Sequence, residues 1–237
     1  MKKVLLTVFL ISLFNTTGFT QSNYSVGLNL GLNYTSFRGS DVLDNTNSGF
    51  GHLEGLFVEY RIDKRFAINT GLNLDSKSIK YETNYTYTYF DQQKFEVVNE
   101  RWDVKTTNRY KYLTIPLLLK YSFGKSKCFF VNGGGFISFW QNHTKKSRAI
   151  NDKGVVIDNY SSSSGNNFPL ADDVSSDYGL SFGLGKLFKL DNRNTISVEL
   201  RDNLGLCNTI EGTFVQGVSG VIKTNSLSLI ASWSFCL

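Results

Sequence analysis

Apolar and polar residues alternate with a period of two over most of the chain. In the stretch YSVGLNLGLNYTSF, residues 24–37, Tyr, Val and Leu occupy successive alternate positions, with Ser, Gly, Asn and Thr between them. Because neighbouring side chains of a β-strand point to opposite faces of the sheet, this pattern predicts a strand with one apolar and one polar face. Seven further segments show the same pattern: residues 55–62, 66–75, 112–123, 127–140, 178–188, 195–205 and 226–235.

The connections between these eight predicted strands alternate in length. The second and third, the fourth and fifth, and the sixth and seventh strands are separated by the short turns DK, GKSK and DNRN. The other connections are long and polar, and the longest runs from about residue 141 to residue 177. Short turns on one side and long loops on the other are typical of outer-membrane barrels. The predicted fold is all-β: an eight-stranded antiparallel closed transmembrane β-barrel with short periplasmic turns and long extracellular loops.

The two faces of the strands predict which side contacts lipid. Each strand has roughly the ten residues that a tilted strand needs to cross hydrocarbon, and the sheet must close because unpaired backbone groups are costly in lipid. Leu, Val, Ile and Phe then face lipid, while Gly, Ser, Asn and charged residues face the lumen. Aromatic residues mark both predicted strand ends, as at membrane interfaces. They are Tyr24, Tyr60, Phe66, Tyr121, Phe123, Phe188, Trp233 and Phe235 at the inner end, and Tyr34, Phe50, Phe139 and Tyr178 at the outer end.

The N-terminus has the pattern of a secretory signal peptide. Two lysines precede an apolar run over residues 4–14, and small residues allow cleavage before the glutamine that follows residue 20. We expect residues 1–20 to be a signal peptide and residues 21–237 to form one outer-membrane β-barrel domain in a Gram-negative outer membrane. A retained membrane anchor is the alternative, although the run is shorter than the roughly 18 residues of a spanning helix.

Composition and charge narrow the function classes. The chain has 21 Gly, two Pro and a 14% aromatic share, which suits strands. Its formal charge of +5 falls to +3 without the two leader lysines (5 − 2), and both signs are mixed along the chain, so we expect no nucleic-acid partner. Cys128, Cys207 and Cys236 are widely spaced and predict packed thiols, with one disulfide as the alternative. No cofactor or metal is expected.

One strand carries a family resemblance. In YLTIPLLLKYSF, residues 112–123, Tyr112, Pro116, Lys120 and Tyr121 stand in the order Tyr-Leu-x-Ile-Pro-Leu-Leu-x-Lys-Tyr. Together with VGLNLGLNY at residues 26–34, this strand resembles the PorT-like family of outer-membrane β-barrel proteins. The resemblance implies an eight-stranded barrel with a structural or envelope role, or an accessory role in an outer-membrane protein-secretion assembly.

Pro116 is unusual in a predicted strand. Proline lacks the N–H that a ladder needs, and in sheets it occurs at edges or bulges. Because a closed barrel has no edge, we expect a bulge or a lost ladder bond at Pro116, with its ring toward the lumen.

The predicted lumen contains charges of both signs. An eight-stranded barrel is just wide enough for side chains to fill it, and a lone buried charge is very costly. We therefore expect interlocking ion pairs that close the lumen; a narrow ion path or binding site is the alternative. The candidate residues are Glu59, Arg61, Asp75, Lys120, Glu199 and Arg201.

Catalysis and metal binding are poorly supported by the sequence. A lipid-modifying barrel enzyme would use His52 or His143 with a hydroxyl nucleophile, but the sequence shows no triad, so we expect no catalytic residue. Asp172 and Asp173 are too few ligands for a calcium site.

Surface adhesion is the remaining alternative. The residues around 81–102 predict a Tyr-rich hairpin standing above the bilayer, which suits partner binding; a stiff extension of the two strands without a binding role is the alternative. The expected partners are outer-membrane lipid and envelope proteins, and the expected state is a monomer.

Overall fold

The computed structural model describes residues 23–39, 46–93, 95–165, 176–208 and 221–237. The predicted signal peptide and its cleavage point lie outside these residues, as do Asp172 and Asp173. Within the described ranges, no helix has the length and apolar character needed to cross a membrane.

All regular structure in the described ranges is β-strand. The nine strands are β1 (Tyr24–Arg38), β2 (Thr46–Arg61), β3 (Phe66–Asp91), β4 (Glu96–Phe123), β5 (Phe129–Asn151), β6 (Val156–Gly165), β7 (Ser176–Lys189), β8 (Asn194–Gly205) and β9 (Lys223–Cys236).

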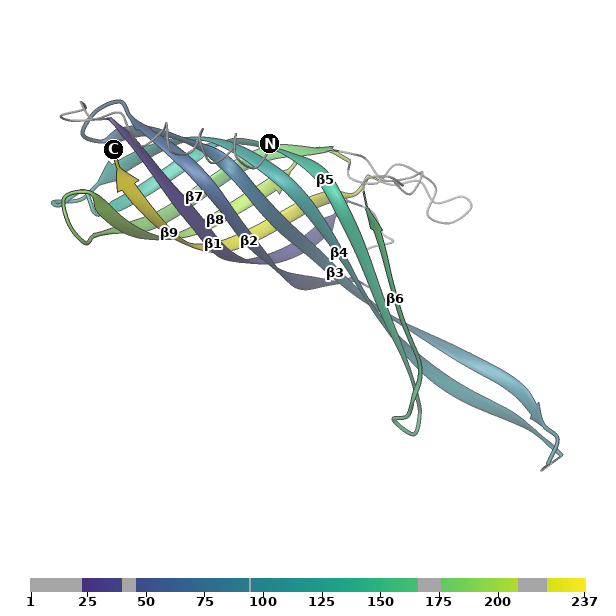
Figure 1. The fold of residues 1–237 in the computed structure, drawn as a ribbon. Helices are drawn as coiled ribbons and strands as arrows, with labels where there is room; N and C mark the ends of the chain where they lie inside the picture. Colours follow the sequence, from purple (N-terminus) through teal and green to yellow (C-terminus); the bar gives the residue numbers. More distant parts are fainter. Residues whose placement is uncertain (1–22, 40–45, 94, 166–175, 209–220) are drawn as a thin grey trace, which may run out of the picture.

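These strands form one antiparallel, ring-like sheet. Its order is β4-β3-β2-β1-β9-β8-β7-β5-β6, and β4 also pairs with β5. Eight strands therefore each have a hydrogen-bonded neighbour on both sides, while β6 pairs with β5 outside the ring (Figure 1). The first and last strands of the ring pair from Ser25–Cys236 to Arg38–Lys223. The eight predicted strands are the eight of the ring, and β6 is an additional strand that the sequence analysis did not predict.

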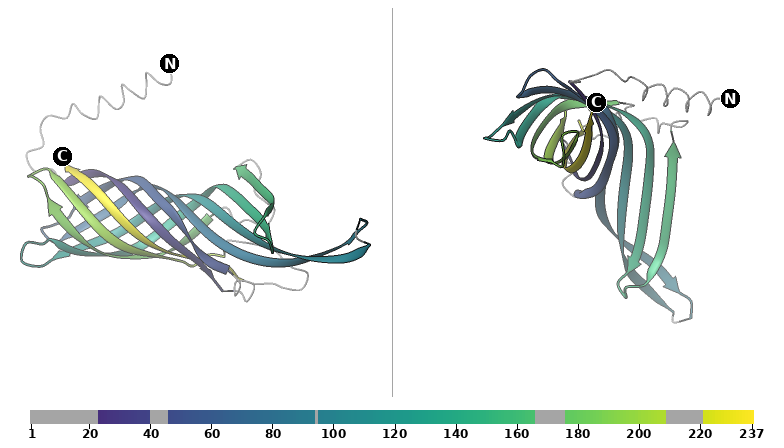
Figure 2. Two further views of the ribbon diagram at one scale, coloured as in Figure 1. Left: turned by 90° about the horizontal axis from the view of Figure 1, so that it is seen from below. Right: turned by 60° about the vertical axis from the view of Figure 1, so that its left-hand side comes forward.

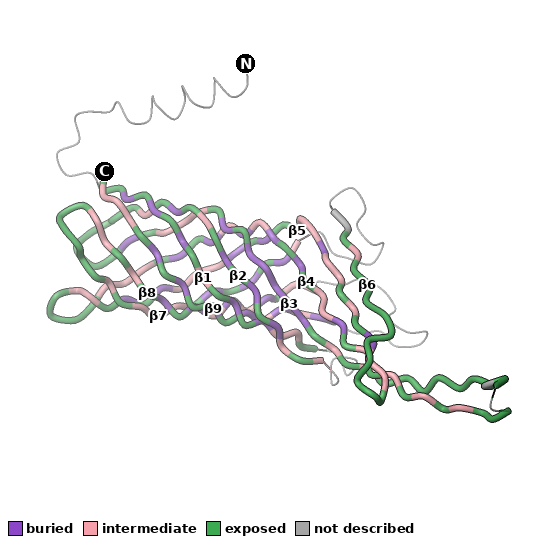
Figure 3. The backbone as a smooth tube through the Cα atoms, turned by 60° about the horizontal axis from the view of Figure 1, so that its bottom comes forward, coloured by how far each residue is buried: buried purple, intermediate pink, exposed green. Residues whose placement is uncertain are grey.

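The two faces of the ring follow the period-two pattern. Leu30 and Leu32 are 64% and 65% exposed, whereas Asn33 and Thr35 on the same strand are fully buried. Figure 3 shows this alternation of buried and exposed positions around the ring. The apolar face thus points outward and the polar face inward, the reverse of a water-soluble domain, which buries its large apolar residues.

The interior is not purely polar, which corrects the predicted division of the faces. Phe57, Phe130 and Ile230 are buried inside the ring together with Asn and Ser side chains. Glycine makes room for the two phenylalanine side chains: a Cβ on Gly27 would lie 2.4 Å from the phenyl group of Phe57, and one on Gly185 would lie 2.3 Å from that of Phe130. Gly27 and Gly185 therefore act as packing positions for two of the aromatic side chains that fill the interior.

Aromatic side chains pair at both ends of the ring. Tyr24 and Tyr60 on neighbouring strands have ring centroids 4.9 Å apart at one end, and Tyr34 and Phe50 have centroids 5.1 Å apart at the other. These pairs are cross-strand neighbours in the register of β1 and β2, and such pairs stabilise a sheet. They belong to the two groups of aromatic residues predicted at the strand ends.

Two hairpins extend beyond one end of the ring. The β2–β3 pairing ends at Thr46–Tyr81, but the β3–β4 pairing continues to Asp91–Glu96. β5 continues to Asn151 and pairs with β6 over residues 142–150 (Figures 1 and 2). The prediction of a loop from about residue 141 was therefore wrong for this part. The Ser and Lys residues of this segment are typical of loops. Backbone groups form the hydrogen bonds of the sheet, however, so these side chains are compatible with an exposed strand.

Pro116 interrupts the ladder without a change of register. The β3–β4 pairing stops at Thr70–Leu117, resumes at Asn73–Thr114, and keeps the same register across the gap. The Thr70 hydroxyl donates to the Pro116 carbonyl oxygen at 2.7 Å, and Pro116 is buried on the inward face. A lost ladder bond, and not a bulge between β3 and β4, accommodates the proline.

Three short turns lie at the end of the ring opposite the hairpins, at residues 62–65, 124–128 and 190–193. In two of them an aspartate organises the backbone. Asp63 Oδ1 accepts from the N–H groups of Arg65 and Phe66 at 2.6 and 2.7 Å. Asp191 Oδ1 accepts equivalent bonds at 2.7 and 2.6 Å from residues 193 and 194. Aspartates at these positions form Asx-type turns, which suit tight hairpins.

Candidate functional site

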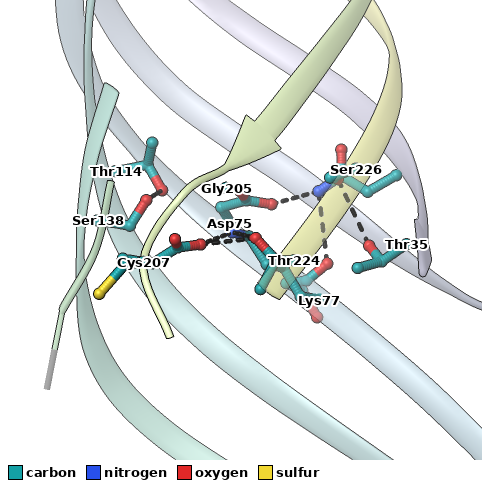
Figure 4. A network of polar contacts seen from close by, with 12 residues as sticks. Thr35, Asp75, Lys77, Thr114, Ser138, Gly205, Cys207, Thr224 and Ser226 are labelled. Atoms are coloured by element: carbon teal, nitrogen blue, oxygen red, sulfur yellow. Dashed lines mark hydrogen bonds and ion pairs between the residues drawn. The ribbon is translucent and has the colours of Figure 1, made fainter. Parts of the chain in front are cut away.

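One almost fully buried polar cluster in the ring joins three strands. Lys77 Nζ of β3 lies 2.7 Å from Asp177 Oδ2 of β7 and 3.1 Å from Thr224 Oγ1 of β9. The Thr224 hydroxyl also donates to Asp177 Oδ2 at 2.7 Å. The Lys77 and Asp177 side chains are 1% and 0% exposed. Figure 4 shows Lys77 and Thr224 facing one another in the interior. This cluster fixes the distance between strands that are not neighbours in the ring.

The ammonium group of Lys77 also lies over two aromatic rings. Its Nζ is 5.0 Å from the centroid of Tyr112 and 5.4 Å from that of Phe136. Such cation–π contacts strengthen when water is excluded. Lys77 is therefore held by an acid, a hydroxyl and two ring faces, an arrangement that suits a fixed structural ion pair.

A second cluster surrounds Asp75, which is 2% exposed. The Asn33 amide donates to Asp75 Oδ1 and is 3.4 Å from the carbonyl oxygens of His52 and Ser76. Asp75 is thus bonded to an amide, and it forms no ion pair within 4.0 Å among the described residues.

Two ion pairs lie nearer the end with the short turns. Arg201 Nε and Nη2 donate to the two oxygens of Glu199 at 2.5 and 2.9 Å, and Asn132 donates to Glu199 Oε1 at 3.0 Å. Lys120 Nζ lies 2.8 Å from Glu59 Oε2 and 4.5 Å from the centroid of the Phe130 ring. Forked Arg–carboxylate bonding of this kind is geometrically specific.

The cavity between these pairs is small. It has a volume of about 30 Å³ and is lined by all four charged residues of the two pairs together with Phe57 and Phe130. Because one water needs roughly 10–15 Å³ of such space, this cavity has room for only about two waters. The side chains therefore fill this level of the ring.

The six predicted lumen residues are only partly brought together. Glu59 pairs with Lys120 and Glu199 with Arg201, while Asp75 belongs to the separate amide cluster. Arg61 is exposed at the mouth, and its side chain makes no ion pair in the described part of the chain. Lys120, Pro116 and Tyr112 face inward, and Tyr121 lies at the aromatic end beside Phe66.

Lys77 and Asp177 were missed by the sequence analysis. The signal for Lys77 was present, because it continues the inward series of Asn73 and Asp75 on the same strand. Asp177 precedes the predicted start of its strand by one position and has the inward parity of Gly179. What the sequence did not contain was their pairing across the ring.

Arg61 lines an open cavity at the turn end of the ring. This cavity has a volume of about 270 Å³. Its lining includes six basic residues and two acidic ones: Arg61, Lys64, Arg65, Lys120, Lys127, Lys189, Glu59 and Asp63. Both acids have partners, because Glu59 pairs with Lys120 and Asp63 accepts turn N–H groups. The mouth is therefore strongly basic.

The two histidines lie in different environments. His52 is exposed on the outward face of β2. His143 is buried on the hairpin side of the ring, stacked on the Tyr110 ring with centroids 4.6 Å apart, and its Nε2 is 3.3 Å from Asn108 Oδ1. Burial, followed by the charge of Lys145, lowers the pKa of His143. Among the residues whose side chains the structure describes, neither ring hydrogen-bonds to a serine hydroxyl, and no group of three His, Cys, Asp or Glu side chains is placed to hold a metal.

Comparison with known proteins gives a family match. The sequence model of the outer membrane protein beta-barrel domain matches residues 19–211. No curated protein matches the chain. Among solved structures, Neisserial surface protein A is 11% identical with a TM-score of 0.45, covering 91% of this chain and 98% of its own. OprG from Pseudomonas aeruginosa is 13% identical with a TM-score of 0.40, covering 91% and 96%. The outer membrane protease OmpT from Escherichia coli is 10% identical with a TM-score of 0.35, covering 94% and 99%.

Proposed function

Because the chain belongs to the outer membrane protein beta-barrel domain family, we propose that its eight-stranded ring is a closed transmembrane barrel with a structural or assembly role. The observation that carries this proposal is the reversal of the two faces. Exposed leucines such as Leu30 and Leu32 stand outside, and buried Asn33 and Thr35 stand inside. An outward apolar surface of this extent is stable only in contact with lipid.

The proposed topology places the short turns in the periplasm and the two hairpins outside the cell. The aromatic pairs Tyr24–Tyr60 and Tyr34–Phe50 then lie at the two interfaces. Aromatic side chains favour this level of a membrane, and short periplasmic turns with longer outer connections are usual in such barrels. This arrangement supports the predicted orientation.

We propose that the interior works as a plug. The ion pairs Lys77–Asp177, Glu199–Arg201 and Lys120–Glu59 occupy successive positions inside the ring, together with buried aromatic rings. The cavity between the last two pairs has room for only about two waters. A diffusion pore would need an open path, so the filled interior favours a non-enzymatic structural protein or an accessory component of an envelope assembly such as a protein-secretion machine, as the PorT-like resemblance implies.

A second candidate function is partner binding through the β3–β4 hairpin. Tyr85, Tyr87 and Tyr89 are exposed on one face of this hairpin, and the Tyr87 ring stacks on Trp102 with centroids 5.2 Å apart. Large, ordered rings of this kind are favourable contact surfaces. These aromatic side chains favour adhesion because they lie beyond the eight-stranded sheet, where no other element in the described ranges covers them.

A lipid-modifying enzyme is the least supported candidate. The buried ring of His143 stacks on a tyrosine and bonds to an amide oxygen, while a catalytic base needs a nucleophile within hydrogen-bond reach. Replacing His143 or His52 should therefore leave the mass of lipid A unchanged in cells that carry the protein.

Site-specific photocrosslinking in cells tests the assembly role against adhesion. A photoreactive residue is placed at Lys64 in a periplasmic turn, at Tyr87 on the outer hairpin, or at Leu30 on the lipid face as the control. The assembly role predicts protein adducts from Lys64 that match periplasmic components. Adducts from Tyr87 alone, to a host protein or glycan, would instead support adhesion, and adducts from neither would contradict both roles.

A further inference from the structure

The hairpins carry a one-sided basic surface, which we call the outer basic face. It lies on β3, β4 and β5 and consists of Lys80, Lys105, Arg109, Lys111, Lys146 and Arg148. All six side chains are exposed. The register places Lys105 directly beside Arg148, and Lys80 and Lys146 on either side of Thr107. The six cations thus form a continuous patch across three strands.

Few acids neutralise this patch. Lys105 Nζ lies 3.2 Å from Glu82 Oε1, and both side chains are more than half exposed. Arg109 Nε lies 3.4 Å from a serine hydroxyl. Lys111, Lys146 and Arg148 form no ion pair within 4.0 Å with any described residue. Exposed pairs such as Lys105–Glu82 are weak, so most of the positive charge remains available to a ligand.

The outer basic face continues the lipid-facing side of the ring. On β4, the outward residues are Leu119, Leu117, Ile115 and Leu113, and the next outward residue is Lys111, followed by Arg109. In the β4–β5 pairing, β5 has one extra residue at the step between Lys111 and Tyr112. Beyond this step the even-numbered residues of β5 point outward, and Lys146 therefore lies on this side. The surface therefore changes from apolar to basic within two residues along the same face.

The opposite face of the hairpins has a different character. Tyr85 and Tyr87 of β3, Trp102 and Tyr110 of β4, and His143 of β5 share the inward parity. Most basic residues of the hairpins therefore lie on the side that points, lower down, at lipid, whereas Lys145 of β5 has the inward parity. An unspecific solvated surface has no reason to separate aromatic and basic side chains in this way.

The position along the strands matches the height of the membrane headgroups. Lys111 and Arg109 lie two and four residues beyond Leu113, which corresponds to roughly 7 and 13 Å along a strand. Figures 1 and 2 show the two hairpins leaving the ring obliquely, in the direction of the strand tilt. The start of the outer basic face thus lies just above the hydrocarbon, where lipid phosphates are found.

We propose that the outer basic face binds the phosphate groups of the anionic lipids in the outer leaflet, of which bisphosphorylated lipid A is the chemical type. This inference rests on the proposed function, since it needs a barrel with its hairpins on the outer side. Arg109 offers a planar, forked donor set to a phosphate, and the lysines act as point charges. Clusters of four to eight basic residues beside a membrane bind anionic lipid in this manner.

Lipid binding to the purified full chain tests the proposal. The protein in neutral detergent is titrated with bisphosphorylated lipid A, or with the same lipid after removal of both phosphates, and the bound lipid is counted by native mass spectrometry. The variant R109Q/K111Q/K146Q removes three cations of the outer basic face. The matched control K64Q/K125Q/K189Q removes three exposed cations at the turn end.

The proposal predicts that the outer variant binds bisphosphorylated lipid A about a hundredfold more weakly than the wild type. The control variant should stay within about twofold, and binding should weaken as salt screens the charges. Equal binding of the dephosphorylated lipid, or equal weakening by both variants, would overturn it. Unchanged far-ultraviolet circular dichroism ensures that each variant is folded.

A second measurement tests the membrane orientation on which this inference rests, independently of lipid binding. An epitope tag inserted between Lys153 and Gly154, in the turn before β6, is probed with antibody on intact cells. If the tag is inaccessible there but accessible in lysed cells, the proposed orientation fails. If it is accessible on intact cells and the lipid-binding result is negative, only the outer basic face is wrongly assigned.

Discussion

Lys77 and Asp177 form an ion pair across the interior of the ring, with 2.7 Å between Nζ and Oδ2, although 100 residues separate them in the chain. Both are almost fully buried, and Thr224 bonds to both. This cluster connects β3, β7 and β9, which are not joined to one another by the backbone ladders of the sheet.

Removing one partner of this pair should destabilise the protein strongly. Lys77→Met leaves the Asp177 charge buried, and Asp177→Leu leaves the Lys77 charge buried, each at a cost of roughly 3–5 kcal/mol. The double variant should lose less than either single variant, because it leaves no unpaired charge. Urea unfolding in lipid vesicles, followed by Trp fluorescence, measures this. Single variants as stable as the wild type would show that the pair is not structural.

Glu54 is an acid on the outward face of the ring. It lies beside Leu30 on β1 and Leu74 on β3, and it is exposed between the aromatic pairs that mark the two ends. A charged group on the lipid face is unfavourable, and an acid costs less there than a lysine or arginine. We expect Glu54→Leu to raise the unfolding free energy in vesicles by about 1–2 kcal/mol.

The variant Glu54→Gln is the control for that experiment, because it removes the charge and keeps a polar group. Its effect should lie between those of wild type and Glu54→Leu. A loss of stability in Glu54→Leu would mean that the outward face at this level contacts water or a polar partner.

The short turns should weaken in acid. Hydrogen bonds from the backbone N–H groups of Arg65 and Phe66 lower the pKa of Asp63 below its ordinary value of 3.8. A carboxyl group with a lowered pKa in the folded state stabilises it above the unfolded pKa, and this contribution is lost as the pH falls through the folded pKa. The variant Asp63→Asn should therefore show a smaller loss of stability below pH 4 than the wild type, measured by unfolding at a series of pH values. An identical pH dependence of the two would contradict the role assigned to Asp63.

His143 should make the hairpin region sensitive to mild acid. Burial is the first cause of its lowered pKa, and the charge of Lys145 is the second. Because the folded state disfavours the protonated ring, this region should lose stability as the pH falls below 6.5, the ordinary pKa, toward the folded value. Hydrogen exchange of β4 and β5 beyond the ring should rise in that window. The variant His143→Phe keeps a ring against Tyr110 and should abolish the rise; if the rise persists, another group is responsible.

The ring of strands could be predicted from the sequence because each strand repeats one local rule. The alternation in residues 24–37 predicts which side chains point outward, and the aspartates at residues 63 and 191 indicate the turns. These features depend only on residues that are neighbours in the sequence, so they can be recognised without knowledge of the fold.

The pairing inside the ring could not be predicted in the same way. Lys120 and Glu59 lie on strands separated by β3, and they meet because of the register on both sides of that strand. Lys77 and Asp177 meet across the interior, which depends on the tilt and offset of all eight strands. β6 was missed for a different reason: its serine-rich sequence has no apolar alternation, and it joins the sheet through the backbone ladder with β5.

Accessibility of spin labels along β1 in lipid vesicles decides whether the apolar face of the barrel contacts lipid. In a chain whose three cysteines are replaced by serine, single labels are placed at Leu28, Leu30 and Leu32, and at Asn29 and Asn33. We expect strong relaxation by lipid-soluble oxygen at the three leucine positions and little at the two asparagine positions. The opposite alternation, or strong relaxation by a water-soluble nickel complex at the leucine positions, would contradict a barrel with its apolar face in lipid.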